Sequence, residues 1–305
     1  MKKFIIAALL PLLILFAGCT KNSADKEEPV RTRTIIDDTG KSVTVKADVQ
    51  RIVILHAMYL EYFFALGKPP VASTGASAGN AIDVINSAET LKPYRETAQI
   101  IDLGSAREIN AEAVLAAKPD VIVTFKGHAD RVYERLVQIA PVIQIDFYAP
   151  WQHQTRLCAQ VAGKEEFAER FIAETEDIIA SARGKLSANK EKTLALFRTD
   201  GKTLVTRANK EYYELFGITK PKGYPDNYTP VSLESLAEMN PDYIVFQDSA
   251  KRAGAYADFV KSSSVWRSLD ATVKGNVIYF DDSLNSFGPL ALRLTAENLL
   301  KVYSR

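Results

Sequence analysis

The sequence is poor in the residues that build metal cages and disulfide frameworks. Its 305 residues include two cysteines and three histidines. The histidines, His56, His128 and His153, form no closely spaced pair, which argues against a metal ion held directly by the protein. The cysteines, Cys19 and Cys158, are too few for a disulfide framework. For Cys158 we expect a buried position on a helix, and a catalytic thiol is the alternative.

The sequence also lacks an excess of either charge. Lys and Arg number 38 and Asp and Glu 37, which leaves a net charge of +1. A nucleic-acid-binding protein would carry a basic stripe, and none is visible. No complete Gly-x4-Gly-Lys-Ser/Thr phosphate-binding loop occurs, so we do not expect this chain to hydrolyse ATP. The hydrophobic content of 47% is ample for a globular core, and the length suggests two domains or one large one.

An apolar run opens the chain. In MKKFIIAALLPLLILFAGCT, Lys2 and Lys3 precede an apolar stretch over 4–17, which is too short to span a bilayer and is typical of a signal peptide. The small residues before Cys19 resemble the bacterial lipobox, in which the cysteine is lipidated, although Phe16 stands where that pattern usually has Leu. An ordinary secretory signal or a membrane anchor is the alternative. We therefore expect a lipoprotein signal peptide over 1–18 and a lipid-anchored flexible tether over 19–32.

Beyond the tether, short apolar runs alternate with helical segments. A hairpin is predicted for TIIDDTGKSVTVKA, which alternates on either side of Asp-Thr-Gly. Strands separated by helices predict parallel pairing and an α/β architecture. The predicted strands form two sets, RIVIL, PVAST, QIIDL, DVIVTF and VIQID in the first, and TLALFR, TLVTR, DYIVF and NVIYF in the second.

A long helix is predicted between the two sets. Residues 164–186 contain apolar residues at helical spacing and no proline, and one helix of this length would extend about 35 Å. That is long enough to bridge two lobes. The expected boundaries are an N-terminal lobe over 33–150, linking helices that include the long one over 151–189, and a C-terminal lobe over 190–305.

One phrase occurs twice. EAVLAAKPDVIV, residues 112–123, and ESLAEMNPDYIV, residues 234–245, share Glu, Pro, Asp, Ile and Val at matching places. Asn110 and Ser232 are suitable N-caps for a short helix, which the shared proline would end before a buried strand. We interpret each copy as one unit of each lobe, so that two similar α/β layers follow one another. A coincidental repeat of a common helix–strand connection is the alternative.

Six motifs run through the chain in order: TGKSVTVKADVQRIVIL, EYFFALGKPPVAS, IDLGSAREINAEAVLAAKPDVIV, YERLVQIAPVIQID, VSLESLAEMNPDYIVF and SSVWRSLDATVKGNVIYFD. Together they resemble the substrate-binding lipoproteins of ABC importers for ferric siderophores, which are relatives of cobalamin- and heme-binding proteins. The resemblance covers essentially the whole mature chain. It implies two Rossmann-like α/β lobes joined by a single long helix, with a ligand cleft between the lobes. It also implies that one surface glutamate of each lobe docks on the permease, and Glu112 and Glu234 occupy those motif positions.

The resemblance implies a chelated rather than a bare iron. Fe(III) prefers oxygen ligands, which a siderophore supplies itself. The protein then needs a cleft with cations, hydrogen-bond donors and aromatic walls, beyond the carboxyl ends of its strands. The basic loop residues favour an anionic complex, with hydroxamate or citrate-type siderophores ahead of catecholates. The expected ligand-binding residues are Tyr59, Arg107, Lys126, His128, Arg207, Tyr228, Arg252 and Phe287.

These candidates have alternatives. A single basic loop residue is often a solvated charge, and Tyr59 could belong to the core beside Phe63. The scaffold could instead bind heme or cobalamin, because Tyr59, Met58 or His128 could supply an axial ligand. GASAG matches Gly-x-Ser-x-Gly and would make Ser77 the nucleophile of a serine hydrolase. A structural lipoprotein with an empty cleft is the remaining alternative.

The expected function is capture and delivery without catalysis. Lipid on Cys19 would hold a monomeric protein at the extracytoplasmic face of the bacterial cell membrane. The protein would take a ferric siderophore as its transported ligand, with no cofactor, no metal site of its own and no nucleic acid. Its partners would be the permease subunits of an ABC importer, with an ATPase subunit behind them.

Overall fold

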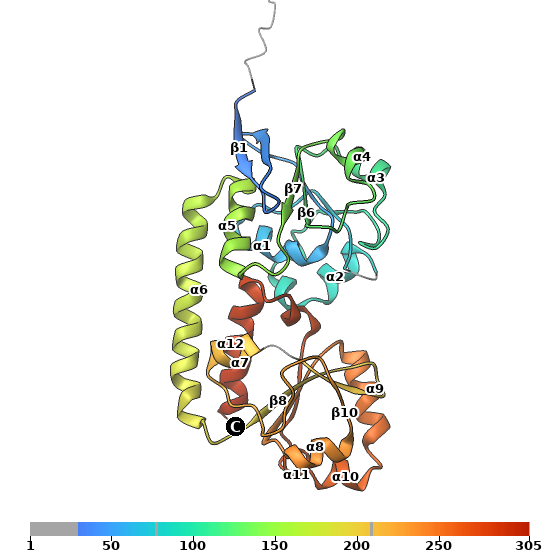
Figure 1. The fold of residues 1–305 in the computed structure, drawn as a ribbon, viewed down its shortest axis with the longest axis vertical. Helices are drawn as coiled ribbons and strands as arrows, with labels where there is room; N and C mark the ends of the chain where they lie inside the picture. Colours follow the sequence, from blue (N-terminus) through green and yellow to red (C-terminus); the bar gives the residue numbers. More distant parts are fainter. Residues whose placement is uncertain (1–29, 77–78, 208–209, 305) are drawn as a thin grey trace, which may run out of the picture. The chain divides into compact units, whose positions relative to one another are not determined.

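The computed structural model describes residues 30–304 except 77–78 and 208–209 (Figure 1). The chain from Arg31 onwards forms one compact unit. Cys19 and Ser77 lie outside the described residues, so the lipidation of Cys19 stays a prediction. Within the described ranges, no helix is both long enough and apolar enough to cross a membrane.

The predicted hairpin forms near the start of the described chain. Strands β1 (Thr32–Ile36) and β2 (Ser42–Lys46) pair antiparallel. Asp37 stabilises the turn, because its Oδ1 accepts a hydrogen bond from the backbone N–H of Thr39 (2.9 Å). Gly40 completes the turn with a φ of +82°, a left-handed conformation that glycine adopts without steric cost.

The first lobe is built on a five-stranded sheet with the order β5-β4-β3-β6-β7. Every neighbouring pair is parallel, as predicted. Parallel sheets lie between helical layers, so their strands are buried on both faces and read as continuous apolar runs. The strands are β3 (Ile52–Ile54), β4 (Ala72–Ser73), β5 (Ile101–Asp102), β6 (Val121–Phe125) and β7 (Val142–Ile145).

Helices cover both faces of this sheet. They are η1 (Ala57–Tyr59), α1 (Leu60–Ala65), α2 (Ala81–Ser87), η2 (Glu89–Tyr94), α3 (Ala111–Ala116) and α4 (Tyr133–Val137). Ile52 of β3 belongs to the core that contains Phe63 of α1. The next residue, Val53, belongs to the core that contains Val114 of α3 and Leu136 of α4. The two-residue period of the strand therefore separates two hydrophobic cores.

The lobes are connected by α5 (Trp151–Ala162), α6 (Glu165–Leu186) and η3 (Ser187–Asn189). Gly163 ends α5 in a left-handed conformation with a φ of +66°, and α6 begins two residues later. The 22 residues of α6 extend about 33 Å. The long helix predicted for residues 164–186 is therefore confirmed.

The second lobe contains a mixed sheet with the order β10-β9-β8-β11-β12. β11 is parallel to β8 and β12, but β9 is antiparallel to β8 and β10. The prediction of purely parallel pairing is wrong here. Only residues 200–203 separate β8 from β9, which suffices for a hairpin but not for the crossover that a parallel pair needs. The strands are β8 (Leu194–Thr199), β9 (Leu204–Thr206), β10 (Pro230–Val231), β11 (Tyr243–Gln247) and β12 (Val277–Phe280).

The long helix α6 (yellow-green in Figure 1) contacts helices of both lobes. It packs against α5 at the first lobe and against α7 and α12 of the second. Arg293 of α12 reinforces this contact, because its Nε donates to Oγ1 of Thr175 on α6 (2.8 Å). The helices of the second lobe are α7 (Lys210–Phe216), α8 (Leu233–Met239), α9 (Ala250–Val260), α10 (Ser264–Ser268), α11 (Asp270–Val273), η4 (Asp282–Ser286) and α12 (Pro289–Tyr303).

The repeated phrase folds in the same way in both lobes, as α3 and β6 in the first and as α8 and β11 in the second. Its aspartate makes the same contact in each. Asp120 Oδ2 accepts the backbone N–H of Arg51 (2.9 Å), immediately before β3. Asp242 Oδ2 accepts the backbone N–H of Thr193 (2.8 Å), immediately before β8. Each aspartate thus fixes the start of the neighbouring parallel strand, and the interpretation of two similar α/β layers is confirmed.

Candidate functional site

Elements beyond the carboxyl ends of the two sheets contact one another. Glu61 of α1, which follows β3, accepts a hydrogen bond from the backbone N–H of Ala291 in α12 (3.0 Å). The backbone N–H of Glu89 in η2 donates to Oδ1 of Asp281, the residue that follows β12 (3.0 Å). Ligands of open α/β sheets bind beyond the carboxyl ends of strands. We therefore call the residues at these strand ends, in both lobes, the ligand face.

A buried aspartate holds two arginines on the ligand face of the second lobe. Asp248, 3% exposed, directly follows β11. Its Oδ1 accepts from Nε of Arg252 (2.5 Å), and its Oδ2 lies 3.4 Å from Nε of Arg198. Asp282 accepts from Nη2 of Arg198 (2.8 Å). We call these four residues the arginine cluster. The arginine side chains remain 32% and 44% exposed, so they are oriented but still open to an anion.

A third arginine lies beside this cluster. The Nη2 of Arg207 donates to the backbone oxygen of Asn285 (2.9 Å), and its Nη1 bonds to the hydroxyl of Tyr228. Asn285 in turn donates to Oδ1 of Asp282 (2.7 Å), which links Arg207 to the cluster. Burial and the neighbouring Arg198 lower the pKa of Arg207 to about 10, so it stays charged at neutral pH. The structure thus brings the predicted residues Arg207, Tyr228 and Arg252 together.

Phe287 ends η4 in a left-handed conformation with a φ of +58°. Its side chain packs partly buried against the core of the second lobe, and its ring centroid lies 5.8 Å from that of Tyr212. Phe287 therefore lies at the edge of the ligand face rather than fully on it.

Two predicted cations lie at the carboxyl end of the first sheet. Lys126 directly follows β6, and its Nζ lies 3.6 Å from Oδ2 of Asp146, with 44% of the side chain exposed. Arg107 is exposed in the loop after β5, and its backbone N–H donates to Oγ of Ser105 (3.2 Å). Both side chains are at least partly exposed, and the carboxylate of Asp146 offsets part of the charge of Lys126.

Five aromatic rings form a continuous set on the ligand face of the first lobe. Phe125 stacks on His128 at 4.3 Å and contacts Phe147 at 5.6 Å between ring centroids. Phe147 contacts Tyr148 at 5.1 Å, and His56 meets Phe125 edge-on at 5.5 Å. The rings come from the carboxyl ends of β3, β6 and β7. We call His56, Phe125, His128, Phe147 and Tyr148 the aromatic wall.

The histidines of this wall are neutral. Nδ1 of His128 lies 3.0 Å from Oγ1 of Thr124, and its Nε2 lies 2.7 Å from the backbone oxygen of Ala106. The carbonyl requires a proton on Nε2, so the neutral ring accepts at Nδ1 from the threonine hydroxyl. Burial lowers the pKa of His128. Burial, followed by the proximity of His128, lowers the pKa of His56 to about 4. His128 therefore offers a ring face rather than a charge or a free nitrogen.

The structure contradicts the expectation that Tyr59 contacts the ligand. Tyr59 is fully buried, at 0% exposure, in the core of the first lobe, where its ring lies 5.8 Å from that of Tyr62. Tyr59 lies at the junction of η1 and α1, and its side chain belongs to the same hydrophobic cluster as Ile52 and Phe63. The alternative, in which Tyr59 is a core residue beside Phe63, is correct. The same burial excludes Tyr59 as an axial ligand of a heme iron.

The two repeat glutamates lie on the surface. Glu112 and Glu234 are both exposed, each in the first turn of its helix. Asn110 Oδ1 accepts the backbone N–H of Glu112 (3.0 Å), and Ser232 Oγ accepts that of Ser235 (3.1 Å), so both predicted N-caps form. The equivalent glutamates therefore occupy equivalent positions on the two lobes.

The described residues provide no protein-built metal site. Among them, no group of three or more His, Cys, Asp or Glu side chains could hold a metal ion. Cys158 is fully buried on α5, and burial raises the pKa of its thiol, which opposes thiolate formation and a catalytic role. The expectation of a buried helical position for Cys158 is confirmed.

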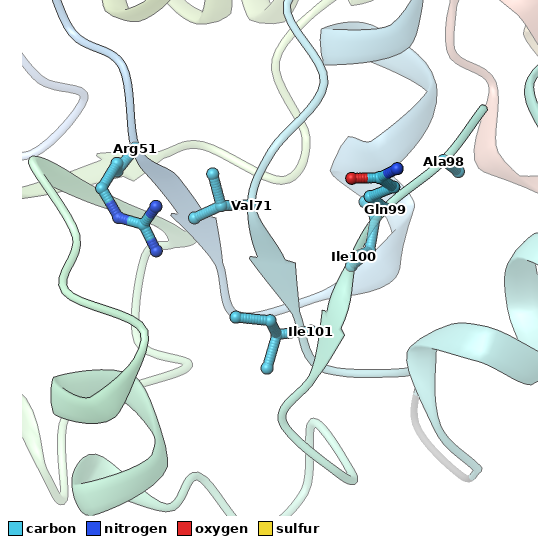
Figure 2. A pocket seen from close by; sticks show the side chains of 6 residues that line it. All are labelled: Arg51, Val71, Ala98, Gln99, Ile100 and Ile101. Atoms are coloured by element: carbon cyan, nitrogen blue, oxygen red, sulfur yellow. The ribbon is translucent and has the colours of Figure 1, made fainter.

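A hollow lies at the opposite end of the first sheet from the ligand face (Figure 2). Arg51, Val71 and Ile100 each directly precede a strand, so the hollow lies at the amino ends of β3, β4 and β5. The Nε of Arg51 donates to the backbone oxygen of Lys118 (2.9 Å), which gives this arginine a structural role. The hollow is lined by Arg51, Val71, Ala98, Gln99, Ile100 and Ile101.

Sequence reasoning missed several residues of the ligand face, among them Arg198, Asp248, Phe147 and Tyr148. Arg198 lies within β8 rather than in a loop, and Asp248 directly follows β11, where only basic and aromatic residues were sought. Phe147 and Tyr148 follow β7 almost directly, so the strand-end rule that selected Lys126 could have found them. Their exposed fractions of 45% and 91% are large for aromatic side chains.

The chain matches the family model described as periplasmic binding protein over residues 52–284, and it therefore belongs to this family. The Fe(3+)-citrate-binding protein YfmC of Bacillus subtilis (strain 168) is 27% identical over 316 residues, which cover 99% of this chain and 97% of YfmC. The iron(3+)-hydroxamate-binding protein FhuD of the same organism is 25% identical over 320 residues, and this alignment covers 93% of this chain and 94% of FhuD. Both relatives are named as binding proteins rather than enzymes.

Solved structures share the fold. SirA of Staphylococcus aureus, complexed with staphyloferrin B, superimposes with a TM-score of 0.69 at 22% identity, over 90% of this chain and 99% of SirA. The iron-uptake system-binding protein FeuA of Bacillus subtilis gives a TM-score of 0.69 at 22% identity, over 88% and 100% of the two chains. The predicted fold class, two α/β lobes joined by a single long helix, is confirmed.

Proposed function

We propose that this member of the periplasmic binding protein family captures an anionic ferric siderophore and delivers it to an ABC importer. The observation that carries the proposal is the arginine cluster together with Arg207. Three arginines face two aspartates, so these five side chains together carry a net charge of +1. A planar guanidinium can bind a carboxylate or hydroxamate oxygen through two parallel hydrogen bonds, which suits a chelate whose oxygens already surround the iron.

The comparisons support iron chelates as the ligand class. The relatives described above are named for Fe(3+)-citrate and for iron(3+)-hydroxamate, and SirA is complexed with staphyloferrin B. Both named classes carry oxygen donors and bring negative charge to the iron. The iron is then cargo held by the siderophore, and the protein needs hydrogen-bond donors rather than metal ligands. Arg107 and Lys126 would add contacts from the first lobe.

The delivery step uses the equivalent surfaces of the two lobes. Glu112 and Glu234 would each dock on one permease subunit, since two similar subunits require one similar contact from each lobe. ATP hydrolysis would take place in a separate subunit. Lipid on Cys19 would hold the protein at the extracytoplasmic face of the membrane and raise its effective concentration near the permease.

A fluorescence titration tests the ligand class. Trp151 and Trp266 provide the signal, and ferric citrate, a ferric trihydroxamate, a ferric tricatecholate and hemin are the probes. We expect saturable quenching by at least one ferric siderophore and a weaker response to the iron-free chelator. Saturation by hemin alone, with a Soret band, would favour the heme alternative and contradict the proposal.

A further inference from the structure

The aromatic wall differs from the ligand face of the second lobe in its chemistry. The second lobe presents arginines held by aspartates, whereas the wall presents ring faces and neutral imidazoles. Each ring of the wall contacts another ring of the wall, so the surface is continuous. Continuous apolar surface at a binding face indicates a part of the ligand that is itself apolar.

The exposure of the wall supports a ligand contact over a core role. Tyr148 is 91% exposed and Phe147 is 45% exposed, although only Asp146 separates them from a strand that is buried along its whole length. Asp146 fixes the backbone at this point, because its Oδ1 accepts the backbone N–H of Tyr148 (2.9 Å). The rings are therefore presented outward by an ordered turn.

Apart from the hydroxyl of Tyr148 and Nε2 of His56, the wall offers no free donor atom to a metal ion. Both nitrogens of His128 are engaged by Thr124 and Ala106, and Nδ1 of His56 accepts the backbone N–H of Met58 (3.2 Å). The phenyl groups of Phe125 and Phe147 have no donor atom. Stacking and edge contacts are therefore the main interactions that the ring faces offer, and planar aromatic groups gain most from them.

We propose that the aromatic wall is a subsite for an aryl group of the ligand, so that the transported complex is a ferric siderophore of mixed character. Its carboxylates would lie on the arginine cluster, and at least one aromatic ring would stack on Phe147 or on Tyr148, whose rings stand edge-on to each other. This inference rests on the proposed function, and it names the class of siderophore within it. Ferric citrate, which has carboxylates and no ring, would use only half of the ligand face.

Two ferric probes separate the subsites. One is ferric citrate, and the other is the ferric complex of a citrate bis-amide that carries two dihydroxybenzoyl groups. The test variant is Phe147→Leu with Tyr148→Leu, which keeps apolar volume and removes both rings. The control variant is Phe259→Leu, which removes a ring that is 58% exposed on α9, away from the ligand face. Circular dichroism and thermal unfolding verify that all variants fold.

The parent protein should bind the aryl-bearing complex at least tenfold more tightly than ferric citrate. The double variant should raise the Kd of the aryl-bearing complex about tenfold or more and change that of ferric citrate less than twofold. Phe259→Leu should change neither. Equal losses of affinity for both probes, or no loss for either, would overturn the aryl subsite. In that case tight binding of ferric citrate by the parent would still support the proposed function. Failure of the parent to bind either probe overturns both.

Discussion

The carboxylate of Glu61 lies where a Cβ atom on Gly288 would stand. Gly288 is the N-cap of α12 and has no side chain to accept the free N–H groups of that helix. Glu61 performs this role from the other lobe by accepting the N–H of Ala291. The helix dipole favours a carboxylate at this point, but burial raises the pKa of Glu61 to about 7. An inter-lobe contact beside the ligand face therefore changes its charge near neutral pH.

Glu61→Gln should remove a pH dependence of stability. The folded protein holds this proton up to about pH 7, whereas the ordinary pKa of Glu is 4.5, so the folded state binds more protons within that window. The free energy of unfolding should therefore fall as pH rises from 4.5 to 7, by roughly 3 kcal/mol at most, and then level off. Urea denaturation of parent and variant at pH 5 and pH 8 measures the difference. Parallel pH profiles would show that Glu61 titrates at its ordinary value.

Arg198→Gln should weaken binding of an anionic ferric siderophore. The guanidinium of Arg198 is held by Asp248 and Asp282 and remains partly exposed on the ligand face. Loss of a hydrogen bond from a charged group costs about 1.5–3 kcal/mol, so Kd should rise about tenfold or more. Arg156→Gln is the matched control, because Arg156 pairs with Glu169 on the linking helices. Equal Kd values for both variants would remove Arg198 from the site.

Asp248→Asn distinguishes two effects of Asp248 on ligand binding, its orientation of the two arginines and its own negative charge. The change removes one negative charge, so a purely electrostatic role predicts tighter binding of an anion. Asp248 also accepts hydrogen bonds from Arg198 and Arg252, and a neutral amide holds them less firmly. We expect the loss of orientation to dominate and Kd to rise about threefold to tenfold, measured by the same titration. Tighter binding by the variant would mean that the arginines need no positioning.

Glu112→Ala with Glu234→Ala should abolish siderophore-dependent iron uptake and leave ligand affinity unchanged. Both side chains are exposed on helices that do not contribute to the ligand face. Radioactive iron uptake in cells measures delivery, and quenching of the purified protein measures affinity. Glu134→Ala with Glu238→Ala is the matched control, since these glutamates are also exposed on helices of the two lobes. Lost affinity, or uptake at the parent level, would contradict the docking role.

Asp120→Ala and Asp242→Ala should each destabilise the protein by about 1–3 kcal/mol, because each leaves at least one backbone N–H at a strand start without its acceptor. Urea denaturation measures this loss. Asp258→Ala, which breaks an exposed pair with Lys261, should cost less than about 0.5 kcal/mol. A large loss of unfolding free energy for only one of the two repeat aspartates would mean that their equivalent contacts contribute unequally to stability.

Local sequence patterns predicted most of the fold. Residues 164–186 have helical spacing and no proline, and they form α6. The parallel strands of the first lobe are continuous apolar runs, and this pattern is easily distinguished from the amphipathic pattern of the helices between them. The β8–β9 hairpin was missed because an apolar strand does not specify the direction of its partner. The length of the connection, residues 200–203, does specify it.

The ligand face depended on contacts between distant residues. The sequence by itself determined the two lobes, the long helix between them and the equivalent positions of Glu112 and Glu234, because helix and strand periodicity and N-caps are local properties. Only the tertiary structure decided that Tyr59 is buried, that Asp248 and Asp282 hold Arg198, and that five rings form one wall. Those outcomes depend on which strand ends come together, and that is fixed by the packing of the whole sheet rather than by any short segment.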